Sequence, residues 1–294
     1  MGSQPIGSLA QLRFEAIRLL SSIYPPSEAE ALVHGLLSHL LPDWRLQWLE
    51  SRGLGAFPDS LLPAWHEAIR RLLAQEPLAY IIGKVHFGNL ELEIHPGVFI
   101  PRPETEEWAY WLQSTLQSEP PTKVLDIGTG CGALALFLAK SFPNAEVYAI
   151  DKSPAAVSLA RKNAFKTGLK VRVHQIFFGE EPLPADFPLQ WDLIVSNPPY
   201  IPWESYGETA PNVRWYEPPD ALFGGEKLYK VLGEFALYTL ADGGYLVVEL
   251  FPPRAEWLLN EYERRGFHTF LMQDRRGCPR WVVARRGLSI CGST

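Results

Sequence analysis

Four consecutive residues, Asn197, Pro198, Pro199 and Tyr200, carry the strongest chemical signal in this chain. They follow an apolar run, residues 191–196, that predicts a buried strand. Neither proline can donate to a strand ladder and each fixes φ, so the predicted structure is a stiff loop. The Asn197 side-chain oxygen and the Pro198 carbonyl can each accept one N–H, and the Tyr200 ring can lie against a planar group. The loop therefore predicts a site for a planar NH2 group.

A glycine-rich turn precedes this loop in the chain. It joins a predicted strand, residues 123–127, to a predicted helix, residues 132–142, and it consists of Gly128, Thr129, Gly130, Cys131 and Gly132. Glycines at such a junction allow the backbone to turn tightly and to approach a ligand closely. The turn therefore predicts a nucleotide site, in which we expect Cys131 to serve only as a small residue.

Two aspartates narrow the choice of nucleotide. Asp151 ends the next predicted strand, nineteen residues after Gly132, where its carboxylate can accept both hydroxyls of a ribose. Asp126 stands at the end of the strand before the turn, where an acid would repel a pyrophosphate but would favour an ammonium or sulfonium group. S-adenosylmethionine carries both of these cations. The spacing therefore favours S-adenosylmethionine over NAD as the cofactor.

Composition limits the class of protein. With 47% hydrophobic and 20% charged residues among 294, the chain can bury a sizeable core. A net charge of −6 disfavours avid binding to duplex DNA. Cys131, Cys278 and Cys291 lack metal-ligand spacing, which predicts a reducing compartment and no metal site. We find neither a secretory signal nor a run of about 18 apolar residues, so we expect a cytoplasmic protein.

The chain is expected to divide into three parts. Residues 1–75 have the apolar spacing of helices, and Ser27 with Glu30 resembles a capping box at the start of the second helix. Residues 76–100 alternate as strands do, beginning at Tyr80, and predict a β-hairpin linker. Residues 101–294 form the third part, which opens with a helix that runs to about Gln117.

The third part alternates between predicted strands and helices, which is typical of a mostly parallel sheet covered on both faces. The predicted strands are 123–127, 146–151, 170–176, 191–196, 243–250, 267–273 and 280–286, and the predicted helices that follow the first strand are 132–142, 153–167, 226–240 and 253–265. A short polar stretch, residues 274–279, joins the last two strands, so these are expected to pair antiparallel. The expected fold class is α/β.

Further stretches of the sequence resemble one family. Residues 100–106, Ile-Pro-Arg-Pro-Glu-Thr-Glu, are similar to its signature before the catalytic domain, and residues 214–218 and 221–222 resemble the stretch after its catalytic loop. Residues 274–280 look like its C-terminal hairpin. With the two motifs above, the chain resembles the peptide chain release factor N5-glutamine methyltransferases, the PrmC/HemK family, over nearly its whole length.

The resemblance implies a class I, Rossmann-like methyltransferase fold that uses S-adenosylmethionine. It implies methyl transfer to the side-chain amide nitrogen (N5) of the glutamine in the Gly-Gly-Gln loop of class I release factors. The helical part is then expected to grip the release factor, and neither a membrane nor direct nucleic acid binding is expected. The implied catalytic residues are Asn197, Pro198 and Tyr200, and the implied substrate contacts are these and Pro199.

The implied cofactor contacts are Asp126, Gly128, Thr129, Gly130, Cys131, Gly132, Asp151, Phe177, Phe178 and Asn197. Phe178 is expected to lie against the adenine. Phe177 stands where the family commonly carries Asp, which would accept a hydrogen bond from the adenine amino group.

Other functions share some of these features. The same chemistry would serve a glutamine in another protein, for example a ribosomal protein. An exocyclic adenine amine is also planar, but N6-adenine methylation needs a basic cleft and a target-reading region, of which this acidic chain offers little. A non-catalytic cofactor-binding or interaction module is disfavoured by the intact loop and turn, and an NAD-dependent redox enzyme is disfavoured by Asp126.

Overall fold

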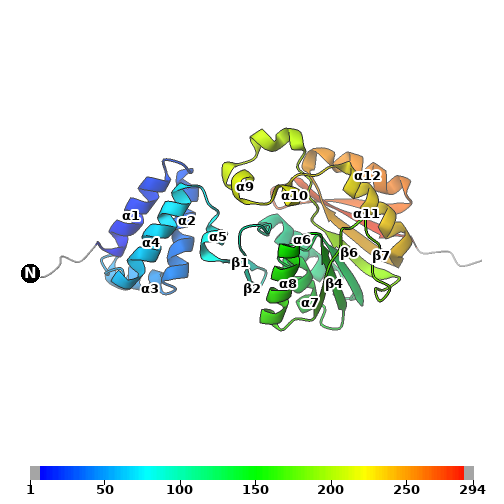
Figure 1. Cartoon of the computed structure of the whole chain (residues 1–294), viewed down its shortest axis with the longest axis horizontal. Coiled ribbons are helices and arrows are strands. Elements are labelled where there is room, and N and C mark those ends of the chain that lie inside the picture. The colour runs from blue at the N-terminus through cyan, green and yellow to red at the C-terminus, as the bar shows by residue number, and fades with distance from the viewer. Residues whose placement is uncertain (1–6, 288–294) are drawn as a thin grey trace, which may run out of the picture. The chain divides into compact units, whose positions relative to one another are not determined.

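The computed structural model describes residues 7–287, which form two compact units (Figure 1). One unit contains the described residues up to Gly83 together with helix α9 (Pro211–Tyr216). The other contains Lys84–Ala210 and the described residues from Glu217 onward. Residues 201–210, which follow the Asn197–Tyr200 loop, therefore belong to the second unit, and the chain enters the first unit only at α9.

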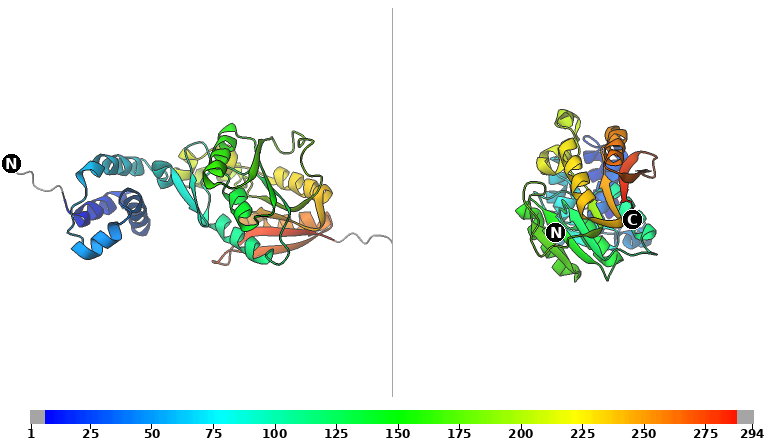
Figure 2. Two further views of the ribbon diagram at one scale, coloured as in Figure 1. Left: turned by 90° about the horizontal axis from the view of Figure 1, so that it is seen from below. Right: turned by 90° about the vertical axis from the view of Figure 1, so that its right-hand side faces the viewer.

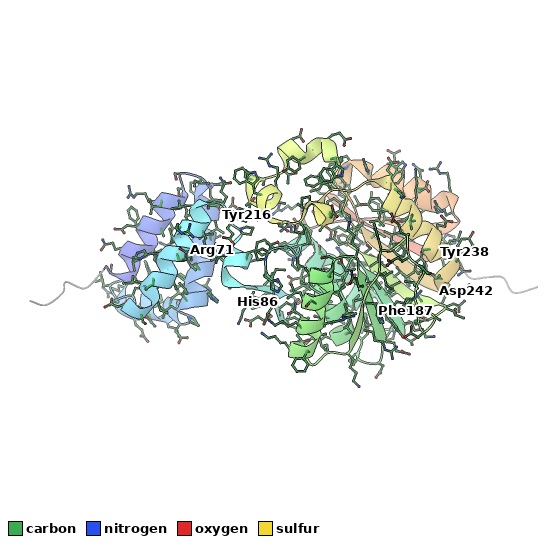
Figure 3. The ribbon with its side chains drawn as sticks, viewed as in Figure 1. Arg71, His86, Phe187, Tyr216, Tyr238 and Asp242 are labelled. Carbon is green, nitrogen blue, oxygen red and sulfur yellow. The ribbon has the colours of Figure 1, made fainter. Side chains whose placement is uncertain are left out.

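The first unit is helical. Its elements in the N-terminal part of the chain are α1 (Leu9–Leu20), α2 (Pro26–Leu40), α3 (Trp44–Ser51), the 3-10 turn η1 (Asp59–Leu61), α4 (Leu62–Leu73) and α5 (Leu78–Ile82). Trp44 and Trp65 are buried in its apolar core, where their rings serve packing. The Tyr216 hydroxyl (Figure 3) donates to the Ala74 carbonyl oxygen at 2.7 Å, which ties α9 to this unit.

Two local predictions about the first unit are wrong. Helix α2 begins at Pro26 with Pro25 as its N-cap and no side-chain cap, because a proline with its fixed φ suits the first helical position and places Ser27 inside the first turn. Tyr80 lies in helix α5 and not in a strand, since a short apolar run fits either element. Gly83 ends that helix with a φ of 75°.

The second unit holds a short hairpin and a larger sheet. Strands β1 (Lys84–Phe87) and β2 (Leu90–Glu93) pair antiparallel. The larger sheet has seven strands in the order β5-β4-β3-β6-β7-β9-β8, and their bounds are β3 Lys123–Ile127, β4 Glu146–Asp151, β5 Val171–Gln175, β6 Trp191–Ser196, β7 Leu240–Glu249, β8 Phe267–Gln273 and β9 Pro279–Arg286. All pairs are parallel except β7–β9 and β8–β9. The predictions of an α/β fold and of an antiparallel final pair are confirmed.

Helices cover both faces of this sheet (Figure 1). Their bounds are α6 Pro103–Thr115, α7 Ala133–Ser141, α8 Pro154–Thr167, α10 Pro219–Leu222, α11 Glu226–Thr239 and α12 Ala255–Arg264, with 3-10 turns η2 (Trp203–Glu208) and η3 (Pro252–Arg254) between them. Apolar residues of the strands, Leu125 among them, form one core with α11 and α12. Side chains alternate between faces along a strand, and Asp126 and Glu249 accordingly bond to α7 and α6 on the other face. The β8–β9 hairpin, red in Figure 2, closes one edge.

The strand order creates a natural binding position. From β3 the chain proceeds through β4 to β5 on one side, and then returns to β6 and β7 on the other side. In open sheets of this kind, ligands bind beyond the carboxyl ends of the strands where the order reverses. That position lies between the ends of β3 and β6, which are followed by the glycine-rich turn and the Asn197–Tyr200 loop.

The structure bears on the expectations about membrane spans and cysteines only for the residues that it describes. Within residues 7–287, no helix is long and apolar enough to cross a membrane. Cys131 is buried and Cys278 is exposed, and both are free thiols. Burial raises the pKa of the Cys131 thiol to about 12, which favours the unreactive protonated form. Cys291 lies outside the described residues.

Candidate active site

A cavity of about 750 Å³ opens at the carboxyl ends of β3, β4 and β6. Its lining includes most of the residues predicted from the sequence to bind cofactor or substrate: Asp126, Gly128, Thr129, Gly130, Cys131, Asp151, Phe177, Phe178, Asn197, Pro198 and Pro199. Gly132 and Tyr200 lie outside the lining. Residues separated by more than 70 positions thus converge on one cavity of ligand size.

The glycines of the turn divide into two kinds. Gly128 and Gly130 have φ angles of 78° and 56°, and a Cβ on either would meet nothing within 4 Å. Gly132 has a φ of 86°, and a Cβ there would lie 3.2 Å from the Ala160 Cβ of α8. The first two therefore give the turn its left-handed backbone beside open space. Gly132 adds close packing between the turn and a helix.

Asp126 is a buried acid without a cationic partner. It is 1% exposed, and its carboxylate accepts hydrogen bonds from the Thr129 hydroxyl at 2.7 Å and the Ala135 amide at 3.2 Å. None of the ion pairs among the described residues includes it. Burial raises the pKa of Asp126 to about 7. A cationic ligand in the cavity would fit this acid, because it would supply the missing countercharge.

Asp151 ends β4 and is held by backbone donors. The Gly130 amide and the Ser153 amide each donate to one of its carboxylate oxygens at 2.9 Å. Burial raises the pKa of Asp151, and these two hydrogen bonds oppose the increase. Each carboxylate oxygen retains a further lone pair. Asp151 can therefore accept ligand hydroxyls while it also fixes the position of the turn.

The two phenylalanines differ in their surroundings. Phe178 packs against the core, with its ring edge-on to Phe235 at a centroid distance of 5.2 Å. Phe177 is 44% exposed, and the Lys152 ammonium lies 5.5 Å from the centroid of its ring. The Phe177 amide donates to the Glu181 carboxylate at 2.8 Å. Phe178 thus forms part of the cavity wall, whereas Phe177 presents a more accessible ring.

The Asn197–Tyr200 loop is held at both ends by backbone and hydroxyl contacts. The Ser196 hydroxyl donates to the Ile127 carbonyl of β3 at 2.8 Å. After the loop, the Ile201 amide donates to the Leu222 carbonyl at 3.0 Å, and the Gly224 amide donates to the Ile201 carbonyl at 3.0 Å. A Cβ on Gly224 would lie only 2.0 Å from the Pro199 carbonyl oxygen. The loop therefore rests directly on the backbone of Gly224.

Buried side chains from α6 and β7 also hold this loop. The Asn197 side-chain NH2 donates to the Thr105 hydroxyl at 2.9 Å, and that hydroxyl donates to the Glu249 carboxylate at 2.6 Å. The Tyr200 hydroxyl donates to the same carboxylate at 3.1 Å. The Tyr200 ring packs against the core cluster. Asn197 and Tyr200, the first and last residues of the loop, are thus connected to one acid.

Sequence reasoning missed several of the residues in this arrangement. Glu249 had a visible signal, since it is a carboxylate in an otherwise apolar predicted strand. Thr105 lies within the residue 100–106 signature but was given no role. Trp108, whose ring N–H donates to the Glu249 carboxylate at 3.0 Å, and Gly224 offered no local signal. Their importance depends on contacts with residues far away in the chain.

Comparisons with known proteins bear on this geometry. The sequence profile described as "Methyltransferase small domain" matches residues 89–211. The chain is 38% identical to a release factor glutamine methyltransferase of Deinococcus radiodurans, over 92% of this chain and 95% of that protein. It is 39% identical to one of Geobacter sulfurreducens, over 82% of this chain and 88% of that protein.

Among solved structures, the Thermus thermophilus 16S rRNA N2 G1207 methyltransferase, solved with AdoMet and guanosine, aligns with a TM-score of 0.51 and 21% identity. The alignment covers 69% of this chain and 49% of that one, and at this identity it supports the fold alone. The sequence relatives cover nearly the whole chain. With an α/β sheet whose cavity lies at the switch point, this chain belongs to the family of release factor glutamine methyltransferases.

Proposed function

We propose that this protein transfers the methyl group of S-adenosylmethionine to the side-chain amide nitrogen of the glutamine in the Gly-Gly-Gln loop of class I release factors. The observation that supports this most directly is the state of Asn197 at the cavity. Its NH2 group is engaged by Thr105, so its oxygen is the end available to accept a hydrogen bond. The relatives described above are named release factor glutamine methyltransferases, which supports methylation of a release factor glutamine.

The residues of the cavity fit S-adenosylmethionine. Asp126 is a buried acid without a countercharge, and Asp151 has free acceptor capacity for ribose hydroxyls. When bound, S-adenosylmethionine supplies an activated methyl group on a sulfonium. Asp126 would hold a cationic group of the ligand, and the backbone at Gly128 and Gly130 would allow close approach. Phe177 or Phe178 would contact the adenine.

The Asn197–Tyr200 loop, which we call the acceptor loop because it would hold the methyl-accepting amide, would position the substrate. A glutamine nitrogen is a weak nucleophile because its lone pair is delocalised into the carbonyl. The Asn197 oxygen and the Pro198 carbonyl would accept its two N–H groups and fix its direction. Orientation of this kind contributes up to about 7–11 kcal/mol in the best intramolecular cases. The same oxygens favour positive charge as it develops on nitrogen.

Substrate recognition would also involve the helical unit. Three leucines near α3, Leu46, Leu49 and Leu54, are 60%, 73% and 77% exposed. Exposed apolar side chains that neighbour one another on a surface mark protein contact sites, and Leu46 and Leu49 lie one turn apart on α3. We therefore expect Leu49→Asp with Leu54→Asp to raise the KM for a whole release factor several-fold while the cofactor Kd stays constant. An unchanged KM would argue that these leucines take no part in docking. A release factor substrate would also place this protein in the compartment where translation terminates.

The central experiment measures transfer of tritium from methyl-labelled S-adenosylmethionine. One sample contains a class I release factor, and a matched sample contains the same factor with its loop Gln changed to Ala. We expect label on the first and none on the second, and Asn197→Ala enzyme serves as the control for catalysis. Equal label on both factors would move the target to another residue. Label on neither, with the cofactor bound, would contradict the proposal and redirect the search to ribosomal proteins and nucleic acids.

A further inference from the structure

Glu249 is a buried carboxylate that no cation pairs with directly among the described residues. It ends β7 and is 1% exposed. Three side chains donate to it, which are Thr105 at 2.6 Å, Trp108 at 3.0 Å and Tyr200 at 3.1 Å. The nearby Arg280 guanidinium bonds instead to Asp274, at 3.1 Å. A buried acid is costly unless its hydrogen bonds are satisfied, and here the satisfying donors come from α6 and from the acceptor loop.

The chemistry of each group sets the direction of these hydrogen bonds. A carboxylate oxygen only accepts, so the single proton of the Thr105 hydroxyl is committed to Glu249. The hydroxyl can then offer only a lone pair to Asn197. The Asn197 amide must therefore present its NH2 group to Thr105 and turn its oxygen away. With a freely rotating hydroxyl, either end of the amide would be accommodated.

The directions of the hydrogen bonds from Asn197 to Thr105 and from Thr105 to Glu249 stay the same when Glu249 is protonated. Burial raises the pKa of Glu249, but Thr105 and Trp108 both donate to Oε2 whereas Tyr200 faces Oε1. A proton on Oε1 would leave Oε2 an acceptor, and the Tyr200 hydroxyl could accept from that proton. The titratable and charged side chains that interact with the acid include Tyr200, Tyr229 and Arg280. The Thr105 proton thus stays committed to Glu249 in either state.

We propose that Glu249, acting through Thr105, is a positioning residue. It fixes which end of the Asn197 side-chain amide faces the methyl-accepting NH2 group of the substrate. The inference rests on the proposed function, since the oxygen of Asn197 must meet an N–H donor. It also explains the position of Tyr200 outside the cavity lining, where its hydroxyl holds the far end of the loop to the same acid. The site would thereby be selective for acceptors that present an NH2 group.

Substitution of Thr105 separates this role from packing. Thr105→Val keeps the shape but removes the hydroxyl, and Thr105→Ser keeps the hydroxyl. We expect Thr105→Val to lower kcat at least tenfold with the cofactor Kd within twofold of wild type, and Thr105→Ser to restore kcat to within about threefold. Equal kcat values for the two variants, with the cofactor bound normally, would overturn the proposal.

Substitution of Glu249 provides a second test. In Glu249→Gln, the amide oxygen can occupy the Oε2 position and the NH2 group can face the Tyr200 hydroxyl, so we expect only a few-fold loss of kcat. In Glu249→Leu no acceptor remains, and we expect the loss seen in Thr105→Val or a larger one. A fully active Glu249→Leu enzyme would contradict the proposal. The Thr105 pair decides the matter if the Leu variant does not fold.

A spectroscopic readout separates this inference from the proposed function. The side-chain 15N–1H signals of Asn197 can be assigned as those lost in Asn197→Ala. We expect them to exchange slowly with solvent in wild type and in Thr105→Ser, and at least tenfold faster in Thr105→Val. The same exchange in all three proteins would sink the inference. Slow exchange as expected, in a wild-type enzyme that leaves release factors unlabelled, would overturn the proposed substrate and leave the orientation of Asn197 standing.

Discussion

The glycine-rich turn and the Asn197–Tyr200 loop follow neighbouring strands, β3 and β6, yet they are held by different kinds of contact. The turn is shaped by its own residues and by Asp151 at the end of the adjacent strand. The loop is held by α6 through Thr105, by the end of β7 through Glu249, and by the backbone of Gly224. The nucleotide half of the cavity is therefore built locally, and the acceptor half is built from distant segments.

This difference predicts separable defects. Changes around the turn should weaken cofactor binding with little effect on the rate at saturation. Changes around the loop should lower the rate with little effect on cofactor binding. The two halves meet where the Ser196 hydroxyl bonds to the Ile127 carbonyl, so a change at that contact should affect both.

Asn197→Ala should give the largest defect. The variant removes an oxygen that would orient the acceptor and stabilise its developing charge. Loss of one such group typically costs about 100- to 1,000-fold in kcat, and we expect this range with a cofactor Kd within threefold of wild type. Single-turnover transfer and calorimetric titration of the cofactor provide the two numbers. Equal losses in rate and in cofactor affinity would show that the two halves are not separable at Asn197.

Gly224→Ala should also act on the rate. Its Cβ would lie 2.0 Å from the Pro199 carbonyl oxygen, so the loop or its support must shift. A displacement near 1 Å at a reacting group can cost about 100-fold, which is the loss of kcat that we expect. Gly225→Ala is the matched control, because a Cβ there meets nothing within 4 Å. Similar kcat values for the two variants would refute the idea that Gly224 supports the loop.

The sequence predicted the local half of this comparison better than the distant half. Periodicity and strand ends place Asp126, Asp151 and the turn correctly because all three depend on short-range pattern. Strand β7 was expected to begin at residue 243 but begins at Leu240. The earlier start arises because Leu240 pairs with Trp191 of β6. The register of the two strands then shifts, and Gly243 within β7 takes a φ of 76°. The contacts of Glu249 with Thr105 and Trp108 span 144 and 141 residues, and no local pattern encodes them.

Asp151→Asn should weaken cofactor binding and spare the rate. The Asn side chain has one oxygen, so it cannot accept from both the Gly130 and the Ser153 amides and also from ribose hydroxyls. Hydrogen bonds to a charged group contribute about 1.5–3 kcal/mol, and we expect a Kd increase of about 30-fold. The kcat at saturating cofactor should stay within threefold. A large loss of kcat without a change in Kd would assign Asp151 to the acceptor half.

The smallest effect concerns pH and Asp126. Its pKa of about 7 in the ligand-free protein lies above the value of an exposed aspartate. Folding therefore binds a proton between these two values, and the contribution of Asp126 to the free energy of unfolding falls as the pH rises from about 4 to 7. A cationic ligand favours the ionised acid, so cofactor binding should follow the opposite trend and strengthen over that interval.

Between pH 5.5 and 7 we expect the cofactor affinity to rise about tenfold, because each pH unit below a pKa leaves about a tenth as much of the ionised form. Titration calorimetry of wild type and Asp126→Asn over this window measures the effect. The Asp151 carboxyl, whose pKa is also raised, contributes a trend of the same sign, so the difference between the two proteins gives the share of Asp126. If both proteins showed the same slope, the countercharge of the ligand would have to lie elsewhere, and the charge argument that favours a sulfonium over a pyrophosphate would lose its structural basis.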